Sequence, residues 1–198
     1  MKTFIIVLAL LTSSAFSDDT YLSSLKHLNF SDGLNKMIER FTVIRYNDST
    51  KNYSIYFQES LGSTIIDLDS AKIDTLTSFL EKYVEWNKKA SSMKVKLDKK
   101  IGSMSSVGPA WILGSNWHFA KECTVTFGFF SQSTSRHQVY ISFSTMYDKY
   151  NKYSKHRPKT VYLTYTQAKK LLKAFSSKEL RKFESKLAGS KKISSQFN

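Results

Sequence analysis

The chain has 198 residues, of which 41% are hydrophobic and 14% aromatic, with 2 prolines and 7 glycines. This composition excludes collagen-like and disordered classes and predicts one globular domain. Lys and Arg number 30 against 16 Asp and Glu, a formal net charge of +14 that favours attraction to polyanions and carries no information about the fold.

Residues 1–17 have the pattern of a cleaved signal peptide. Lys2 precedes an apolar run of 8 residues, from Phe4 to Leu11, and small residues stand at the positions that a signal peptidase reads before cleavage after Ser17. The run is far shorter than the roughly 20 residues of a spanning helix. We therefore expect an exported protein, periplasmic or extracellular, with no integral membrane span; an uncleaved N-terminal anchor is the alternative.

The first half of the mature chain predicts a short helix, three strands and a long helix. The short helix begins at Ser31, because four apolar residues follow helical spacing: Leu34, Met37, Ile38 and Phe41. Alternating β-branched and aromatic residues predict strands at 41–44, 53–57 and 65–68. A helix follows over 69–90 with Asp69 as its N-cap and an apolar stripe of Ile73, Leu76, Leu80, Tyr83 and Asn87.

The second half repeats this order. Residues 93–98 alternate as a half-exposed strand, and strands at 123–127, 139–143 and 161–163 lead into another helix. Thr164 and Gln167 form a capping box for that helix, whose stripe is Ala168, Leu171, Leu172 and Phe175. A last helix opens at Ser176 with Glu179 and ends at Gly189.

The predicted fold class is α+β, with antiparallel sheet built from two similar strand-strand-strand-helix units and helices packed on one face. We expect the first unit, with its N-terminal helix, to span residues 18–90 and the second, with its C-terminal helix, to span 91–198, both within one compact domain. The similarity of the units is one of pattern, so convergence on a common meander is the alternative to duplication.

Cys123 is the single cysteine. Alternation places it beside Val125 and Phe127 on the apolar face of a strand, so we expect a buried core thiol rather than a nucleophile or an intermolecular disulfide. The absence of cysteine pairs favours a bacterial periplasm or exterior over a eukaryotic secretory route.

Charge is distributed unevenly along the chain. Residues 1–90 hold 10 basic and 11 acidic side chains, a net −1, whereas residues 91–198 hold 20 and 5, a net +15. This asymmetry predicts one basic face in the second half.

The segment from Tyr147 to Lys159 is the local feature that points to a ligand. It reads Tyr-x-Lys three times, and in an extended chain a period of three sets rings on one edge and ammonium groups on another, where they meet phosphate, sulfate or carboxylate. The predicted anion-binding residues are Tyr147, Lys149, Tyr150, Lys152, Tyr153, Lys155, Arg157 and Lys159. Basic residues of the last two helices extend the patch: Lys169, Lys170, Lys173, Lys178, Arg181, Lys182 and Lys186. The alternatives are a solvated hairpin loop and charged outer helix faces.

The stretch 108–119 holds Trp111 and Trp117 between glycines. An exposed Trp loop binds sugar rings or a protein partner, whereas a folded one places its Trp residues in the core.

Enzyme chemistry has little support in the sequence. Neither HExxH nor CxxC occurs, no Gly-rich phosphate loop or GxSxG elbow is present, and we expect no metal site and no cofactor. A metal-independent ribonuclease using His118 and His137 is conceivable, since two imidazoles suffice for acid–base cleavage of RNA.

The sequence thus favours a small exported non-enzymatic protein whose basic half binds an anionic partner: envelope polysaccharide, lipid headgroups, nucleic acid or an acidic protein. A structural or inhibitory protein that recognises one specific protein is the second hypothesis, and the ribonuclease is the third. No feature of the sequence predicts the oligomeric state.

Overall fold

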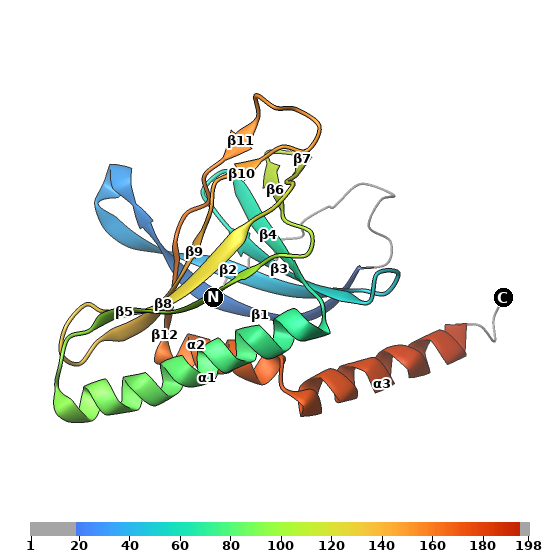
Figure 1. The fold of residues 1–198 in the computed structure, drawn as a ribbon. Coiled ribbons are helices and arrows are strands. Elements are labelled where there is room, and N and C mark those ends of the chain that lie inside the picture. The colour runs from blue at the N-terminus through green and yellow to red at the C-terminus, as the bar shows by residue number, and fades with distance from the viewer. Residues whose placement is uncertain (1–18, 195–198) are drawn as a thin grey trace, which may run out of the picture.

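The computed structural model describes residues 19–194, which form an α+β fold with 29% helix and 47% strand (Figure 1). The predicted signal peptide lies outside these residues. The first half contains β1 (Asp19–Ser31), the 3₁₀ turn η1 (Asp32–Leu34), β2 (Lys36–Asn47), β3 (Asn52–Gln58), β4 (Gly62–Leu68) and α1 (Ser70–Met93). The second half contains β5 (Asp98–Ser105), β6 (Ala110–Leu113), β7 (Asn116–Phe119), β8 (Thr124–Ser131), β9 (His137–Phe143), β10 (Met146–Tyr147), β11 (Lys155–His156), β12 (Val161–Thr164), α2 (Tyr165–Ala174) and α3 (Ser177–Ser194).

Ten strands form one sheet in the order β5-β8-β9-β12-β1-β2-β3-β4-β6-β7, and β10 and β11 form a separate hairpin. All the strand pairs are antiparallel, as the short connections predict. The pairing of β12 with β1 joins the two halves, with Leu28 opposite Tyr162 and Asn29 opposite Val161. Four strands of the sheet precede α1 in the first half and six precede α2 in the second, so the order of elements does not establish a repeat.

The helices lie along the same side of the sheet, at the bottom of Figure 1. The apolar stripe predicted for the long helix is buried, with Ile73, Leu76, Leu80 and Tyr83 facing the sheet. Tyr46 of β2 and Tyr53 of β3 meet the rings of Phe183 in α3 and Phe175 after α2. Alternation along β3 therefore turns Ser54 and Tyr56 to the opposite face, away from the helices.

The sheet curls strongly. The ring of Phe57 in β3 lies 5.4 Å from that of Phe143 in β9, although β12, β1 and β2 separate the two strands in the sheet order. The right-handed twist of neighbouring strands accumulates into this closure and brings distant strands onto one core.

Three predicted elements differ from the structure. The helix expected at Ser31 is wrong: Ser31 ends β1, and the residues after η1 form β2, with Leu34 and Phe41 exposed. A hairpin explains the difference, because Asn35 has a left-handed φ of 48° and β1 pairs with β2 from Ser31 opposite Lys36 back to Asp19 opposite Asn47.

The strand expected at 93–98 is also wrong. Helix α1 extends through Met93 and ends at Lys94, whose φ is 51°, and β5 begins only at Asp98. The last helix starts at Ser177, close to the predicted start, but continues past Gly189 to Ser194.

Cys123 is a free, fully buried cysteine, as predicted. Burial raises the pKa of its thiol to about 11, which keeps it protonated at neutral pH and unsuited to nucleophilic chemistry. Across residues 19–194, every helix is too short or too polar to cross a lipid bilayer.

Candidate functional site

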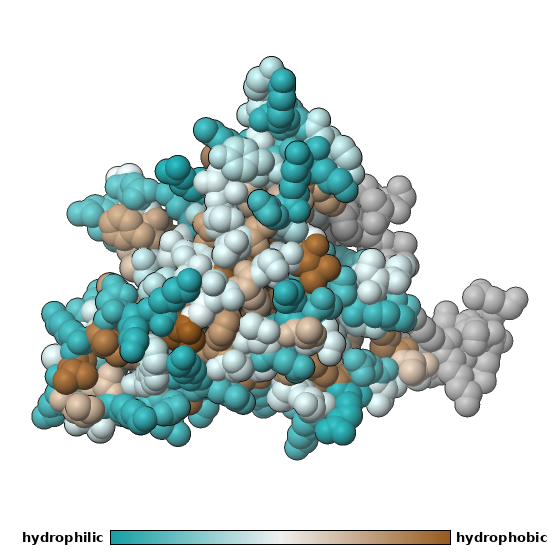
Figure 2. All heavy atoms as spheres, viewed as in Figure 1, coloured by the Kyte–Doolittle hydropathy of each residue, from teal (hydrophilic) through white to brown (hydrophobic). Residues whose placement is uncertain are grey.

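Residues 146–159, which we call the Tyr–Lys hairpin, project from the end of the molecule opposite the helices (Figure 1). The segment is folded, which corrects the expectation of an extended chain: Met146 pairs with His156 and Tyr147 with Lys155. Hydrophilic residues cover this apex in the space-filling view (Figure 2).

Asp148 fixes the turn of the Tyr–Lys hairpin. Its Oδ1 accepts hydrogen bonds from the backbone N–H groups of Tyr150 at 2.7 Å and Asn151 at 3.1 Å. Asn151 in turn accepts from the N–H of Tyr153 at 3.1 Å through its side chain. Such Asx turns satisfy the backbone locally, so the loop holds a defined shape.

The three tyrosines of the hairpin are exposed. Tyr147, Tyr150 and Tyr153 have 55%, 78% and 83% of their surface accessible. Lys149 Nζ lies 5.5 Å from the Tyr150 ring centroid, and Lys152 Nζ lies 5.0 Å from that of Tyr153. Rings and ammonium groups are therefore paired side by side, not separated onto two edges as the sequence predicted.

Most of the hairpin's cations lack an acidic partner. Within the described part of the chain no ion pair involves Lys149, Lys152, Lys155 or Arg157. Lys159 differs, because its Nζ lies 2.5 Å from Asp32 Oδ2.

A stack of three rings attaches the hairpin to the sheet. The Trp111 ring lies between His118, at 4.8 Å with an interplanar angle of 8°, and His156, at 5.6 Å with an angle of 20°. His118 Nδ1 lies 2.7 Å from Asp148 Oδ2, and His156 Nε2 lies 3.2 Å from Glu59 Oε1. The hydrogen bond with His118 lowers the pKa of Asp148 below its usual range, and the hydrogen bond from the backbone N–H of Tyr150 adds a smaller effect in the same direction.

The predicted Trp loop is the β6–β7 hairpin, turning at Gly114 with a φ of 60°. Trp111 is only 3% exposed, so it stabilises the core and is not available to a partner. Trp117 is half-buried on the face of the sheet away from the helices, with its ring centroid 6.4 Å from that of Tyr56 and 6.2 Å from that of Phe119.

The structure separates the two histidines of the ribonuclease hypothesis. His137 starts β9 at the end near α1, where its Nδ1 lies 2.8 Å from Ser131 and its carbonyl accepts from Tyr83. His118 binds Asp148, which lies beyond the other end of β9, about 20 Å along a strand of this length. The two imidazoles therefore do not converge on one substrate bond.

Sequence reasoning missed a groove between β1, α2 and α3. It has a volume of about 430 Å³ and is lined by four lysines with two serines and one glutamate: Lys170, Lys173, Lys182, Lys186, Ser23, Ser24 and Glu179. We call it the lysine groove. It lies at the helix end of the molecule, so these lysines form a second basic site and do not extend the Tyr–Lys hairpin as predicted (Figure 1).

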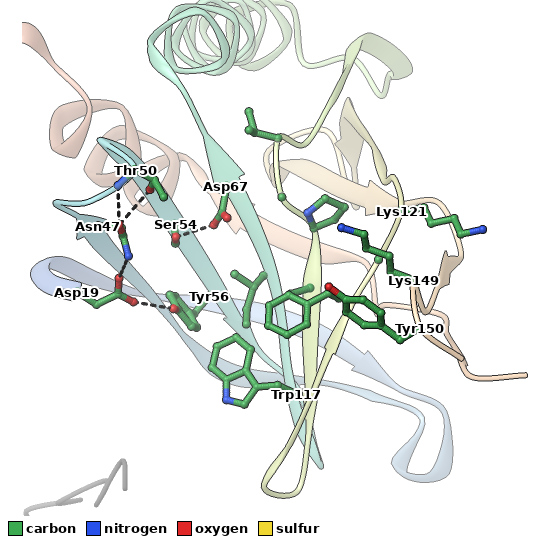
Figure 3. Close-up of a pocket in the computed structure, with 17 residues that line it drawn as sticks. Asp19, Asn47, Thr50, Ser54, Tyr56, Asp67, Trp117, Lys121, Lys149 and Tyr150 are labelled. Atoms are coloured by element: carbon green, nitrogen blue, oxygen red, sulfur yellow. Dashed lines mark hydrogen bonds between the residues drawn. The ribbon is translucent and has the colours of Figure 1, made fainter. Parts of the chain in front are cut away.

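A second cavity, of about 580 Å³, lies on the face of the sheet opposite the helices (Figure 3). We call it the outer cavity. Asp19, Asp67 and Tyr56 line one side, Lys149 lines the other side, and Trp117 lies between them at the lower edge of the view. No local sequence pattern predicts the outer cavity, because its walls come from β1, β3, β4, β7 and the hairpin.

No group of three or more His, Cys, Asp or Glu side chains in residues 19–194 is arranged to hold a metal ion. No family model, curated protein or solved structure matches this chain at a significant level.

Proposed function

We propose that this chain is an exported, non-enzymatic binding protein for an anionic partner and that the Tyr–Lys hairpin is its contact surface. The partner class comprises envelope polysaccharide, lipid headgroups, nucleic acid and acidic proteins. The observation that carries the proposal is the juxtaposition of exposed Tyr150 and Tyr153 rings with adjacent ammonium groups at 5.5 Å and 5.0 Å.

Exposed aromatic rings are unusual on a loop that only needs to be solvated. Three rings more than half exposed cost hydration free energy unless a ligand covers them. Lys149, Lys152, Lys155 and Arg157 form no ion pair with a described residue. Together with these cations, the rings suit a ligand that combines anionic groups with flat sugar or base faces.

The shape of the hairpin supports the same function. Asp148 fixes the turn, and the Lys149 N–H donates to the Phe119 carbonyl at 2.7 Å, so the cations are held on a docked scaffold. A pre-organised loop loses less conformational entropy on binding than a flexible one.

The proposal includes cleavage after Ser17 and the duplication of a strand-strand-strand-helix unit, with the binding surface in the basic second unit. Intact mass of protein recovered outside the cytoplasm tests the cleavage: a chain starting at Asp18 supports it, and a chain that retains Met1 or Lys2 contradicts it.

The first experiment compares retention of residues 18–198 on heparin and on a cation exchanger of matched charge density. We expect the protein to elute from heparin at distinctly higher salt, because the hairpin offers rings and cations together. Replacing Lys149, Lys152, Lys155 and Arg157 with Gln should remove most of that difference.

The lysine groove provides the matched control. Replacing Lys170, Lys173, Lys182 and Lys186 with Gln removes the same charge, and we expect it to lower elution equally on both columns while preserving the preference for heparin. Equal loss of heparin preference in both variants, or no preference in the unmodified protein, would contradict a binding site on the hairpin. Retention would then reflect only the net charge of the protein.

A protein partner is the second candidate. Within the described residues β7 is an edge strand of the sheet, and Leu113 and Phe119 on its hairpin are 51% and 43% exposed. This surface predicts saturable, salt-tolerant binding that Trp117→Ala weakens. Trp111 no longer belongs to it, because its ring is buried.

A further inference from the structure

The outer cavity has two sides of opposite charge. Asp19 at the start of β1 and Asp67 in β4 face it from one side, and Lys149 and Lys121 line the other (Figure 3). Its volume of about 580 Å³ falls within the range of small-molecule sites.

The acidic side holds two carboxylates that form no ion pair within residues 19–194. Asp67 Oδ1 accepts from Ser54 at 2.6 Å, and Asp19 accepts from Asn47 Nδ2 at 2.8 Å and from the Tyr56 hydroxyl at 3.1 Å. Among the described residues neither carboxylate forms an ion pair, although the chain carries 30 basic side chains. Burial and the charge of Asp19 raise the pKa of Asp67, so a bound cation would relieve an unfavourable arrangement.

Aromatic rings and apolar side chains line the middle of the cavity. Tyr56 and Trp117 meet edge to face at 6.4 Å, Phe119 lies parallel to Trp117, and Ile65 and Pro109 complete the lining. These side chains come from three strands and the loop before β6, which fixes their spacing. An apolar group of a ligand has a rigid surface to pack against here.

The basic side is fixed by the docking of the Tyr–Lys hairpin. The Lys149 N–H bonds to the Phe119 carbonyl at 2.7 Å, which places the residue beside the aromatic middle. Lys121 also lines this side, but its ammonium group points away from the cavity (Figure 3). The cavity thus presents carboxylates, then aromatic rings, then the ammonium group of Lys149.

We propose that the outer cavity binds a zwitterion whose charges are separated by an apolar portion, and specifically a di- or tripeptide with both termini free. The terminal ammonium group binds between Asp19 and Asp67, the side chains pack on Tyr56 and Trp117, and the terminal carboxylate binds Lys149. A neutral overall charge matters, because a purely cationic ligand would be repelled by a protein of formal charge +14.

Isothermal titration calorimetry with three forms of one dipeptide tests this. The probes are alanyl-phenylalanine, its N-acetyl derivative, which lacks the ammonium group, and its C-terminal amide, which lacks the carboxylate. We expect the free dipeptide to bind at least about tenfold more tightly than either capped form.

Two conservative variants assign the ends. Asp67→Asn keeps the shape and the contact with Ser54, and it should abolish the preference for the free over the N-acetyl form. Lys149→Gln should abolish the preference for the free form over the amide. Lys173→Gln serves as the control, because it removes one positive charge in the lysine groove and Lys173 does not line this cavity.

Equal binding of all three probes, no saturable heat at millimolar free dipeptide, or saturable binding of a neutral disaccharide instead would overturn the inference. Lys149 belongs to both proposed sites, whereas Asp67 belongs to the outer cavity alone. Asp67→Asn should therefore weaken dipeptide binding and leave the preference for heparin over the cation exchanger unchanged, so that failure of one proposal is distinguishable from failure of the other.

Discussion

His27 shows what burial does to one ionisable side chain. Its ring is fully buried in β1, with Nδ1 2.8 Å from Thr42 Oγ1 and Nε2 3.1 Å from Asn29 Oδ1. Burial lowers the pKa of His27 below its usual 6.5, and Arg40 acts in the same direction, while Asn29 and Glu59 oppose them. The neutral imidazole is therefore the form that the fold accommodates.

We predict that the free energy of unfolding falls as the pH drops below about 6.5. Below that pH the unfolded chain protonates His27 while the folded chain keeps it neutral, so the unfolded state binds more protons and gains stability. Each such group contributes at most about 1.4 kcal/mol per pH unit. Urea unfolding at about pH 7.5 and about pH 5.5 measures the effect.

His27→Gln should reduce this pH dependence and leave a remainder from His137, whose pKa burial also lowers. If the unfolding free energy of the variant depended on pH as strongly as that of the unmodified protein, His27 would have the same pKa in the folded and unfolded states.

At the scale of elements, helix starts were predictable because their hydrogen bonds are local. Asp69 accepts from the N–H of Lys72 at 2.8 Å, and Thr164 forms a complete capping box with Gln167, both within three residues. Residues 31–41 were mispredicted because pairing within the β1–β2 hairpin overrode the local pattern, and residues 93–98 because α1 continues through Met93. The helical spacing of four apolar residues carries no information about a strand with which they could pair in a hairpin.

At Gly62 the backbone of β4 lies close to that of β6. A Cβ added there would lie 1.8 Å from the Ile112 carbonyl oxygen, a backbone atom that cannot move without breaking the strand pairing. We predict that Gly62→Ala lowers the unfolding free energy by about 2 kcal/mol or more and loosens the β6–β7 wall of the outer cavity. Gly33→Ala is the matched control, since a Cβ at Gly33 has nothing within 4 Å.

Thermal unfolding compares the two variants. If Gly62→Ala unfolded no earlier than Gly33→Ala, the close contact between β4 and β6 would not exist in solution.

At the scale of the whole molecule, the positive charge is divided between two ends. The Tyr–Lys hairpin lies at the apex, and the lysine groove lies beside α2 and α3 (Figure 1). Under the proposed function, a short anionic ligand would contact one of these ends at a time. The sequence predicted one basic face from the net +15 of residues 91–198, but the fold distributes those cations.

We therefore predict that the affinity for a short heparin oligosaccharide decreases linearly on a log–log plot against salt concentration. Neutralising four of the hairpin's cations, Lys149, Lys152, Lys155 and Arg157, should flatten the slope by about 3. Each lost contact removes roughly 0.7 to 0.9 of the slope, because each releases about one counterion. Neutralising the lysine groove should change the slope by much less. Fluorescence titrations at several salt concentrations measure this slope. Equal slopes for the two variants would contradict preferential binding at the hairpin.

The sequence by itself determined what depends on near neighbours: the strands at 53–57 and 139–143, the capped helices, the buried Cys123 thiol and the excess of positive charge in the second half. Periodicity and capping act within a few residues, so they can be read locally. Only the tertiary structure decided that β12 pairs with β1, that Phe57 reaches Phe143, and that Asp19, Asp67 and Lys149 line one cavity. These contacts join residues far apart in the chain, and their selection depends on the curl of the whole sheet, which no local pattern encodes.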